Sequence, residues 1–121
     1  YFQAVEKKAY KCFLTENTRL PMMYMQDAVN ATIQIMDANT ADIKTRTSYN
    51  LAAISFTPQE IAEEIKKHIP EFEISYASDF RQEIADSWPQ VIDDSKARND
   101  WNWSHTFDLS LMTTDMLKNL S

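Results

Sequence analysis

The stretch Arg19-Leu-Pro-Met-Met-Tyr-Met-Gln-Asp-Ala-Val29 runs from a short apolar strand directly into an amphipathic helix. Pro21 interrupts the backbone pattern of a strand, and Met22–Met25 are too apolar for a surface loop. Asp27 stands where the first free N–H groups of a helix need an acceptor. The stretch therefore predicts a strand, a cap and a helix, in that order.

The helix that follows is expected to extend from Gln26 to about Asp37. Val29, Ile33 and Met36 recur within it at helical spacing. Three further residues widen this apolar stripe: Ala28, Thr32 and Ile35. A stripe of this width predicts that one broad face of the helix packs on a sheet.

Outward from this stretch, short apolar runs alternate with helical periodicities. Besides the strand before Asp27, the expected strands comprise residues 10–14, 48–55 and 71–76. The expected helices comprise residues 26–37, 58–69, 94–101 and 109–120, with the end of a helix at 2–8 and a short helix or turn at 79–86. Short strands interleaved with about four helices predict a mixed α/β chain, α+β in isolation and without a Rossmann core.

Helix caps define several of these boundaries. Thr57-Pro-Gln-Glu60 is a capping box, because Thr57 can accept a hydrogen bond from the Glu60 N–H while the Glu60 carboxylate reaches back. Aspartates are expected to cap the later helices: Asp93 or Asp94, and Asp108. The last helix is expected to bury the stripe Leu109, Met112, Met116 and Leu120.

Composition narrows the class of protein. A chain of 121 residues, 44% apolar, is long enough for one domain with one core, residues 1–121, although Tyr1-Phe-Gln3 is also compatible with the remnant of a cleavable tag. The net charge of −6 opposes nucleic-acid binding, which depends on cations. No apolar run approaches the roughly twenty residues that cross a bilayer. With one cysteine, Cys12, the chain is expected to be cytoplasmic, without nucleic-acid or membrane partners.

Glycine is absent from the chain. Loops that bind phosphate need glycine, because it allows the backbone to approach the ligand with positive φ. No cofactor is therefore expected on this chain. His68 and His105 have no second cysteine or nearby histidine, which argues against a zinc site, and His68 is expected to be packed and hydrogen-bonded on an apolar stripe.

Four segments, in their order and spacing, resemble the extended short-chain dehydrogenases, which are the NAD-dependent epimerase/dehydratase family. These segments are Leu20–Asp27, Ser48–Thr57, Ile92–Trp103 and Phe107–Leu109. The form Leu-Pro-Met-Met-Tyr-Met and the tract Phe80–Pro89 resemble the L-threonine 3-dehydrogenase branch in particular. The resemblance covers most of the chain.

The resemblance implies both a fold and an activity. The chain would be the C-terminal, substrate-binding part of a subunit whose N-terminal part is a Rossmann domain that binds NAD. The parent would be a homodimer that oxidises L-threonine to 2-amino-3-ketobutyrate. The family's catalytic Tyr, with a Lys four residues on, has no counterpart here, so no catalytic residue is expected in this chain.

Leu20 and Met22 are expected to face the substrate pocket, because side chains alternate along a strand. Where nucleotide-sugar enzymes of the family place an arginine that binds the diphosphate, alignment on Asp27 puts Leu20 here. An apolar wall at this position suits the methyl group of a small amino acid better than it suits a sugar nucleotide. Arg81 is a candidate to bind the substrate carboxylate and Trp88 to close the pocket; alternatively, Arg81 pairs with a neighbouring acid and Trp88 simply packs.

Two other functions stay open. The parent can be a nucleotide-sugar epimerase or dehydratase, in which case Arg81 is the one candidate to replace the missing arginine. The chain can also be a free-standing binding module that has the substrate domain without the redox domain.

Overall fold

Helices and short strands alternate along residues 1–121, all of which the computed structural model describes. The elements in chain order are α1 (Phe2–Lys7), β1 (Ala9–Cys12), β2 (Leu20–Met22), α2 (Met25–Asp37), β3 (Ile54–Phe56), α3 (Pro58–His68), β4 (Glu73–Tyr76), α4 (Arg81–Asp86), α5 (Ser95–Trp101) and α6 (Leu109–Leu120). The expected mixed α/β class is confirmed. The expected number of helices, about four, is too low, because α1 and α4 each form a helix of six residues.

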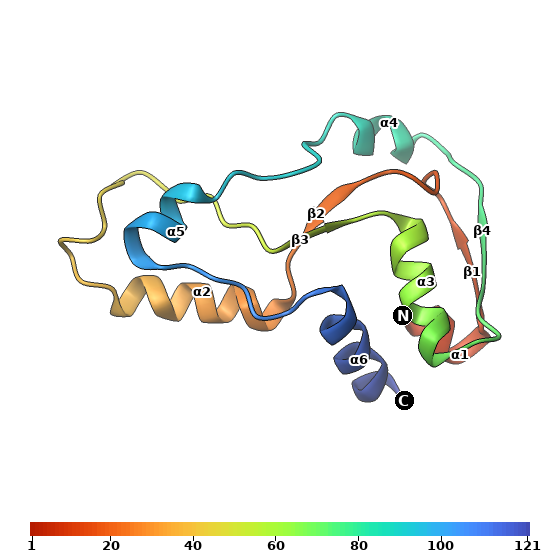
Figure 1. The fold of residues 1–121 in the computed structure, drawn as a ribbon. Coiled ribbons are helices and arrows are strands. Elements are labelled where there is room, and N and C mark those ends of the chain that lie inside the picture. The colour runs from red at the N-terminus through yellow and green to blue at the C-terminus, as the bar shows by residue number, and fades with distance from the viewer.

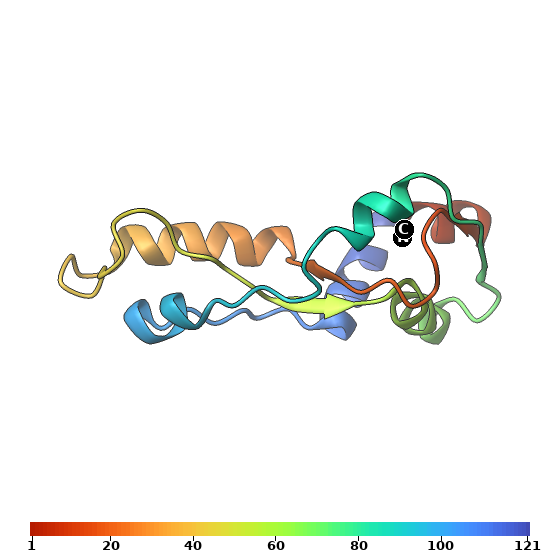
Figure 2. The ribbon, with the colours of Figure 1, turned by 90° about the horizontal axis from the view of Figure 1, so that it is seen from above.

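The molecule is elongated, with helices gathered at its two ends (Figures 1 and 2). Helices α2 and α5 lie at one end, and α1, α3 and α6 lie at the other with β1 and β4 (Figure 1). Strands β2 and β3 connect the two ends. No helix is long and apolar enough to cross a membrane.

The four strands form two separate pairs. Strand β1 pairs in parallel with β4, from Ala9 opposite Glu73 to Cys12 opposite Tyr76. Strand β2 pairs antiparallel with β3, with Leu20 opposite Phe56. Lys8, with φ of 53°, makes the left-handed turn that ends α1 and starts β1.

The strand expected at residues 48–55 is wrong in extent, because only Ile54–Phe56 pairs with a neighbour. In the segment before Ile54, side chains and not a second strand form the hydrogen bonds to the backbone N–H and carbonyl groups of Ala52. The Ala52 N–H donates to the carboxylate of Asp94 at 3.2 Å, and Trp103 Nε1 donates to the Ala52 carbonyl at 3.1 Å. Partners of this kind leave the segment extended but outside any sheet.

Two small apolar clusters replace the single expected core. One consists of Ala4, Ala62, Ile65 and Phe72, and the other of Ala31, Ala97, Trp101 and Trp103. The first belongs to the end that contains α1 and α3, and the second to the end that contains α2 and α5. Each end of the molecule therefore has its own packing.

Helix α2 shows the largest departure from expectation. Tyr24, not Asp27, occupies the N-cap position, and it makes no side-chain cap. Asp27 is fully buried, and its two carboxylate oxygens accept hydrogen bonds from the N–H groups of Thr106 and Phe107 at 2.8 and 3.0 Å. The predicted cap is therefore a link between α2 and a segment about 80 residues later.

The predicted apolar stripe of α2 is buried only in part. Val29, Ile33 and Met36 are exposed, whereas Ile35 packs against the cluster that contains fully buried Ala31. No sheet covers this stripe in the chain. The helix packs instead through the side that contains Asp27, Ala31 and Ile35.

Other caps agree with the sequence. Both hydrogen bonds of the Thr57–Glu60 capping box are present, and Asp108 accepts from the Leu111 N–H at 2.8 Å. At α5, Asp94 occupies the N-cap position but makes no side-chain cap, because its carboxylate binds the Ala52 N–H and Arg98. Asp93, one residue earlier, accepts from the Ser95 N–H at 3.0 Å.

Two burial predictions need correction. His68 is exposed at the end of α3, because the helix turns Ala62 and Ile65 inward instead. In α6 the fully buried residues are Met112, Thr113 and Leu117, and Leu120 is 38% exposed.

Candidate functional site

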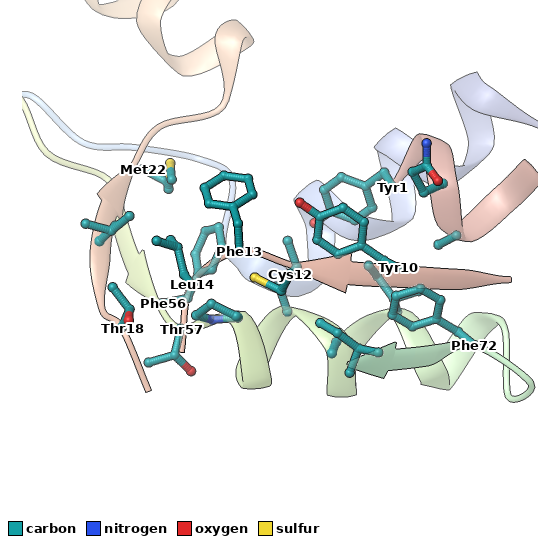
Figure 3. A pocket seen from close by; sticks show the side chains of 18 of the residues that line it. Tyr1, Tyr10, Cys12, Phe13, Leu14, Thr18, Met22, Phe56, Thr57 and Phe72 are labelled. Atoms are coloured by element: carbon teal, nitrogen blue, oxygen red, sulfur yellow. The ribbon is translucent and has the colours of Figure 1, made fainter. Parts of the chain in front are cut away.

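A cavity of about 360 Å³ lies between α1, β1, β2 and α3 (Figure 3). Its walls are mainly apolar and aromatic. They include Phe13, Leu20, Met22, Phe56, Ile61 and Phe72. A hollow with such walls can accept an apolar group, as ligand sites commonly do.

Three hydroxyl groups at this cavity, those of Tyr1, Thr18 and Thr57, are engaged in hydrogen bonds within the chain. The Tyr1 hydroxyl lies 2.8 Å from Thr113 Oγ1, and burial raises the pKa of Tyr1 above its ordinary value. Thr57 Oγ1 accepts from the Glu60 N–H at 3.2 Å. The Tyr1 hydroxyl therefore has a partner within the chain and keeps its proton at neutral pH.

Two of the four predicted site residues lie at this cavity. Leu20 and Met22 both line it from β2, while Met23 packs on the tryptophan cluster of the other end. This alternation agrees with the side that the strand pattern predicted for each residue. That Leu20 and Met22 contact a substrate stays a prediction.

Arg81 lies outside the cavity wall. Its guanidinium donates to Asp79 through Nη2 at 2.6 Å and Nε at 3.0 Å, and it stacks 3.5 Å from the ring centre of Phe13. The side-chain hydrogen bonds from Arg81 lower the pKa of Asp79 to about 2. Phe13 lies between Arg81 and the cavity, so the guanidinium is held by protein groups there.

Trp88 lies at a different place again. Its side chain is 57% exposed and borders a polar hollow of about 200 Å³ that Arg19, Gln82 and Asp86 also line. The structure therefore brings Leu20 and Met22 together but separates both from Trp88. The aromatic part of the wall, Phe13, Phe56 and Phe72, was missed because strand patterns in the sequence identify only core positions.

Arg19 points away from the apolar cavity, as expected from its place beside Leu20. It donates to the Ser55 carbonyl through Nη1 and to Glu60 through Nη2, both at 2.5 Å. The hydrogen bond from Arg19 lowers the pKa of Glu60 below its ordinary value. Neither Arg19 nor Arg81 is therefore an unpaired cation at the cavity.

The residues present do not fit a dinucleotide. Phosphate binds at helix N-termini with free N–H groups and at glycine-rich loops, but the chain has no glycine. Carboxylates occupy the first turn or cap of the three longest helices, at Asp27, Glu60 and Asp108. These carboxylates repel a phosphate. No group of three or more His, Cys, Asp or Glu is placed to hold a metal ion.

Nearly the whole chain is similar in sequence to known proteins. No protein-family model matches it. The mitochondrial L-threonine 3-dehydrogenase of Bos taurus is 48% identical over 118 residues, which are 97% of this chain and 31% of that protein. An uncharacterized epimerase/dehydratase of Staphylococcus haemolyticus is 46% identical over 119 residues, which are 98% of this chain and 37% of that protein. The chain spans about a third of the length of the curated relatives it matches.

The fold is similar to part of a solved enzyme. The crystal structure of L-threonine dehydrogenase from Phytophthora infestans superposes with a TM-score of 0.95 and 48% sequence identity. The superposition covers 99% of this chain and 39% of that chain. The family resemblance found in the sequence is thereby confirmed.

Proposed function

We propose, on the premise that this chain is a partial homologue of the L-threonine 3-dehydrogenases of the epimerase/dehydratase family, that it forms the C-terminal, substrate-side portion of such an enzyme. The observation that carries the proposal is the 48% identity to the Bos taurus enzyme over 97% of the chain. The cavity supports it, because its mainly apolar wall can bind the apolar part of a small substrate.

In the proposed parent, the reaction oxidises the 3-hydroxyl of L-threonine to a ketone. NAD, held by a Rossmann domain outside this chain, would supply the hydride acceptor. Leu20 and Met22 supply an apolar wall for the substrate methyl group. This chain therefore contributes shape and exclusion of water, and the proton-transfer groups lie elsewhere in the polypeptide.

A graft tests this proposal. The matched third of the Bos taurus enzyme is replaced with this chain, and NADH formation is followed with and without L-threonine. We expect threonine-dependent NADH formation by the graft and none by the isolated chain. A graft that folds but does not turn over, or turnover by the isolated chain, would contradict the proposal.

Leu20 offers a matched pair of variants in the graft. Leu20→Arg places a charge in the apolar wall and is expected to raise the KM for L-threonine by about tenfold or more. Leu20→Met keeps the wall apolar and should change KM by less than about threefold. Equal KM values for the two variants would show that Leu20 lies outside the substrate pocket.

A nucleotide-sugar enzyme is the second candidate, favoured by the 46% identity to the Staphylococcus haemolyticus epimerase/dehydratase. It requires a cation for the diphosphate, and Arg81 is already bound to Asp79 and stacked on Phe13. UDP binding to the graft and to its Arg81→Ala variant separates the two functions. Loss of UDP binding in the variant would support this candidate, and unchanged or absent UDP binding would remove it.

A further inference from the structure

Gln82, on α4, connects two parts of the molecule through its half-buried side-chain amide. Its Oε1 accepts the Thr15 N–H at 2.8 Å, and its Nε2 donates to Thr18 Oγ1 at 2.9 Å and to Asp86 Oδ1 at 2.7 Å. The two threonine hydroxyl oxygens also lie 2.7 Å apart. One side chain therefore ties α4 to residues 15–18, which lie between β1 and β2 and are called the 15–18 turn below.

The 15–18 turn leads into the strand whose side chains line the apolar cavity. Thr18 is 9% exposed, and it is the one residue that lines both the apolar cavity (Figure 3) and the polar hollow beside Trp88. Leu20 follows two residues later and lines the apolar cavity as well. A shift of the 15–18 turn would therefore move the wall that contains Thr18 and Leu20.

Only two backbone hydrogen bonds hold the 15–18 turn besides these contacts. The Thr18 N–H donates to the Thr15 carbonyl at 3.2 Å, and the Gln59 N–H of α3 donates to the Glu16 carbonyl at 3.1 Å. The first of these lies within the turn. The Gln82 amide and a single N–H of α3 are therefore its hydrogen-bonded links to the two neighbouring helices.

We propose that Gln82 is a positioning residue for the substrate pocket, which holds the wall at Thr18 and Leu20 in place without contacting the substrate. The inference rests on the proposed function, since it takes Leu20 to line the pocket for L-threonine. Both polar atoms of the Gln82 amide are already engaged by protein groups. A residue that acts only through the shape of a pocket affects how well the substrate binds, so its loss should raise KM more than it lowers kcat.

Kinetics of the graft with L-threonine test the inference. Gln82→Met keeps the length of the side chain but removes its amide donor and acceptor, so we expect KM to rise at least about fivefold while kcat stays within about twofold. Gln59→Met is the matched control, because the exposed Gln59 side chain bonds only to Glu63, at 2.9 Å. The control should leave KM within about twofold. An equal rise in KM for both variants would overturn the inference.

Reversing the polarity of one hydrogen bond distinguishes positioning from a general loss of packing. Gln82→Glu alone puts a carboxylate against Asp86, where an N–H donated before, so KM should rise as it does for Gln82→Met. In Gln82→Glu combined with Asp86→Asn, the amide at position 86 can donate to the carboxylate at position 82, which still accepts the Thr15 N–H. The net charge is unchanged, and we expect KM to return to within about twofold of the unsubstituted graft.

Hydrogen exchange of the Thr15 amide in the folded graft adds a readout that needs no turnover. Gln82→Met should speed this exchange, and the double variant should restore it. Faster exchange together with a raised KM, both restored in the double variant, supports the inference. If the Gln82→Met graft does not fold, Gln82→Glu with and without Asp86→Asn gives the same comparison.

The remaining outcomes separate this inference from the proposed function. An active graft whose KM is unchanged by Gln82→Met overturns the inference and leaves the proposed function standing. A folded graft without threonine-dependent turnover contradicts the proposed function; unchanged exchange at Thr15 then overturns the inference as well, and faster exchange that the double variant restores supports the hold of Gln82 on the turn. A double variant that restores exchange but not KM also overturns it, because Gln82 or Asp86 would then act on the substrate directly.

Discussion

Helices α2 and α3 are similar in length and both amphipathic, but α3 buries apolar side chains that in α2 are largely exposed. Helix α3 buries Ala62 and Ile65, 3% and 4% exposed, and ends in the exposed basic residues Lys66, Lys67 and His68. Helix α2 buries Asp27 and Ala31 and exposes four of its large apolar side chains, Met25, Val29, Ile33 and Met36. An amphipathic sequence therefore fixes that a helix has an apolar side, but not which part of the protein covers it.

The difference shows at which end of the molecule the helices bury their apolar side chains within this chain. Helix α3 packs within the chain on Ala4, Phe72 and α6. Helix α2 is anchored by the buried carboxylate of Asp27, while Met25, Val29, Ile33 and Met36 on its other side stay exposed. The proposed parent enzyme accounts for this, because its remaining length can cover the free side.

Substitution of Trp103, in the apolar cluster on which α2 packs, should have the largest effect on the free energy of unfolding. Trp103 is 2% exposed and donates its Nε1–H to the Ala52 carbonyl, so Trp103→Ala is expected to lower the free energy of unfolding. We expect a loss of about 3–5 kcal/mol. Trp88→Ala, at a tryptophan that is 57% exposed, is the control and should change it by less than about 0.5 kcal/mol. Urea unfolding followed by circular dichroism measures both, and equal losses would contradict the burial of Trp103.

Substitution of Asp27, which anchors α2, should have the second-largest effect on the free energy of unfolding. Asp27→Asn leaves one of the two N–H groups, of Thr106 or Phe107, without an acceptor. We expect a loss of about 2 kcal/mol, as is usual for an unsatisfied buried donor. Asp37→Asn, at the exposed end of the same helix, should be nearly neutral. If both variants unfold at the same urea concentration, Asp27 does not anchor the helix.

The cap of α3 gives a smaller, local effect. Thr57→Ala removes the hydroxyl that accepts from the Glu60 N–H and should cost about 1 kcal/mol. Thr32→Ala, within α2, removes a hydroxyl that only donates to the Ala28 carbonyl and should cost less than about 0.5 kcal/mol. A larger loss at Thr32 than at Thr57 in urea unfolding would mean that the capping box is not formed.

The smallest effect concerns pH. Asp79 has a pKa lowered from 3.8 to about 2 by hydrogen bonds from Arg81, so the charged form stabilises the folded state above pH 4. This contribution is lost as the pH falls from 3.8 toward 2. Stability measurements on wild type and Asp79→Asn should therefore differ at pH 5 and converge near pH 2. A difference that is constant over this range would show that Asp79 is not paired.

Local rules in the sequence predicted much of the fold. The capping box at Thr57, the Asp108 cap and the short helices at 81–86 and 95–101 depend on neighbouring residues, and the structure has them all. Strand alternation likewise placed Leu20 and Met22 on one side.

Long-range contacts explain what the sequence could not predict. Asp27 is a cap by local pattern, but its partners lie about 80 residues later in the chain. Residues 48–53 have strand-like composition, yet Asp94 and Trp103 satisfy Ala52 in place of a strand. The apolar stripe of α2 predicted packing on a sheet, but Val29, Ile33 and Met36 are exposed in this chain. The sequence places Arg81 and Trp88 at the pocket, because no local pattern shows their actual surroundings. In the structure Arg81 stacks on Phe13, and Trp88 borders the separate polar hollow.

The mass of the natural protein in its source cells tests the central claim most directly, using an antibody raised against this chain. The account predicts a band well above 14.1 kDa, because the chain is taken to be the substrate-side part of a longer enzyme. A band at 14.1 kDa would contradict it and would favour a free-standing binding module.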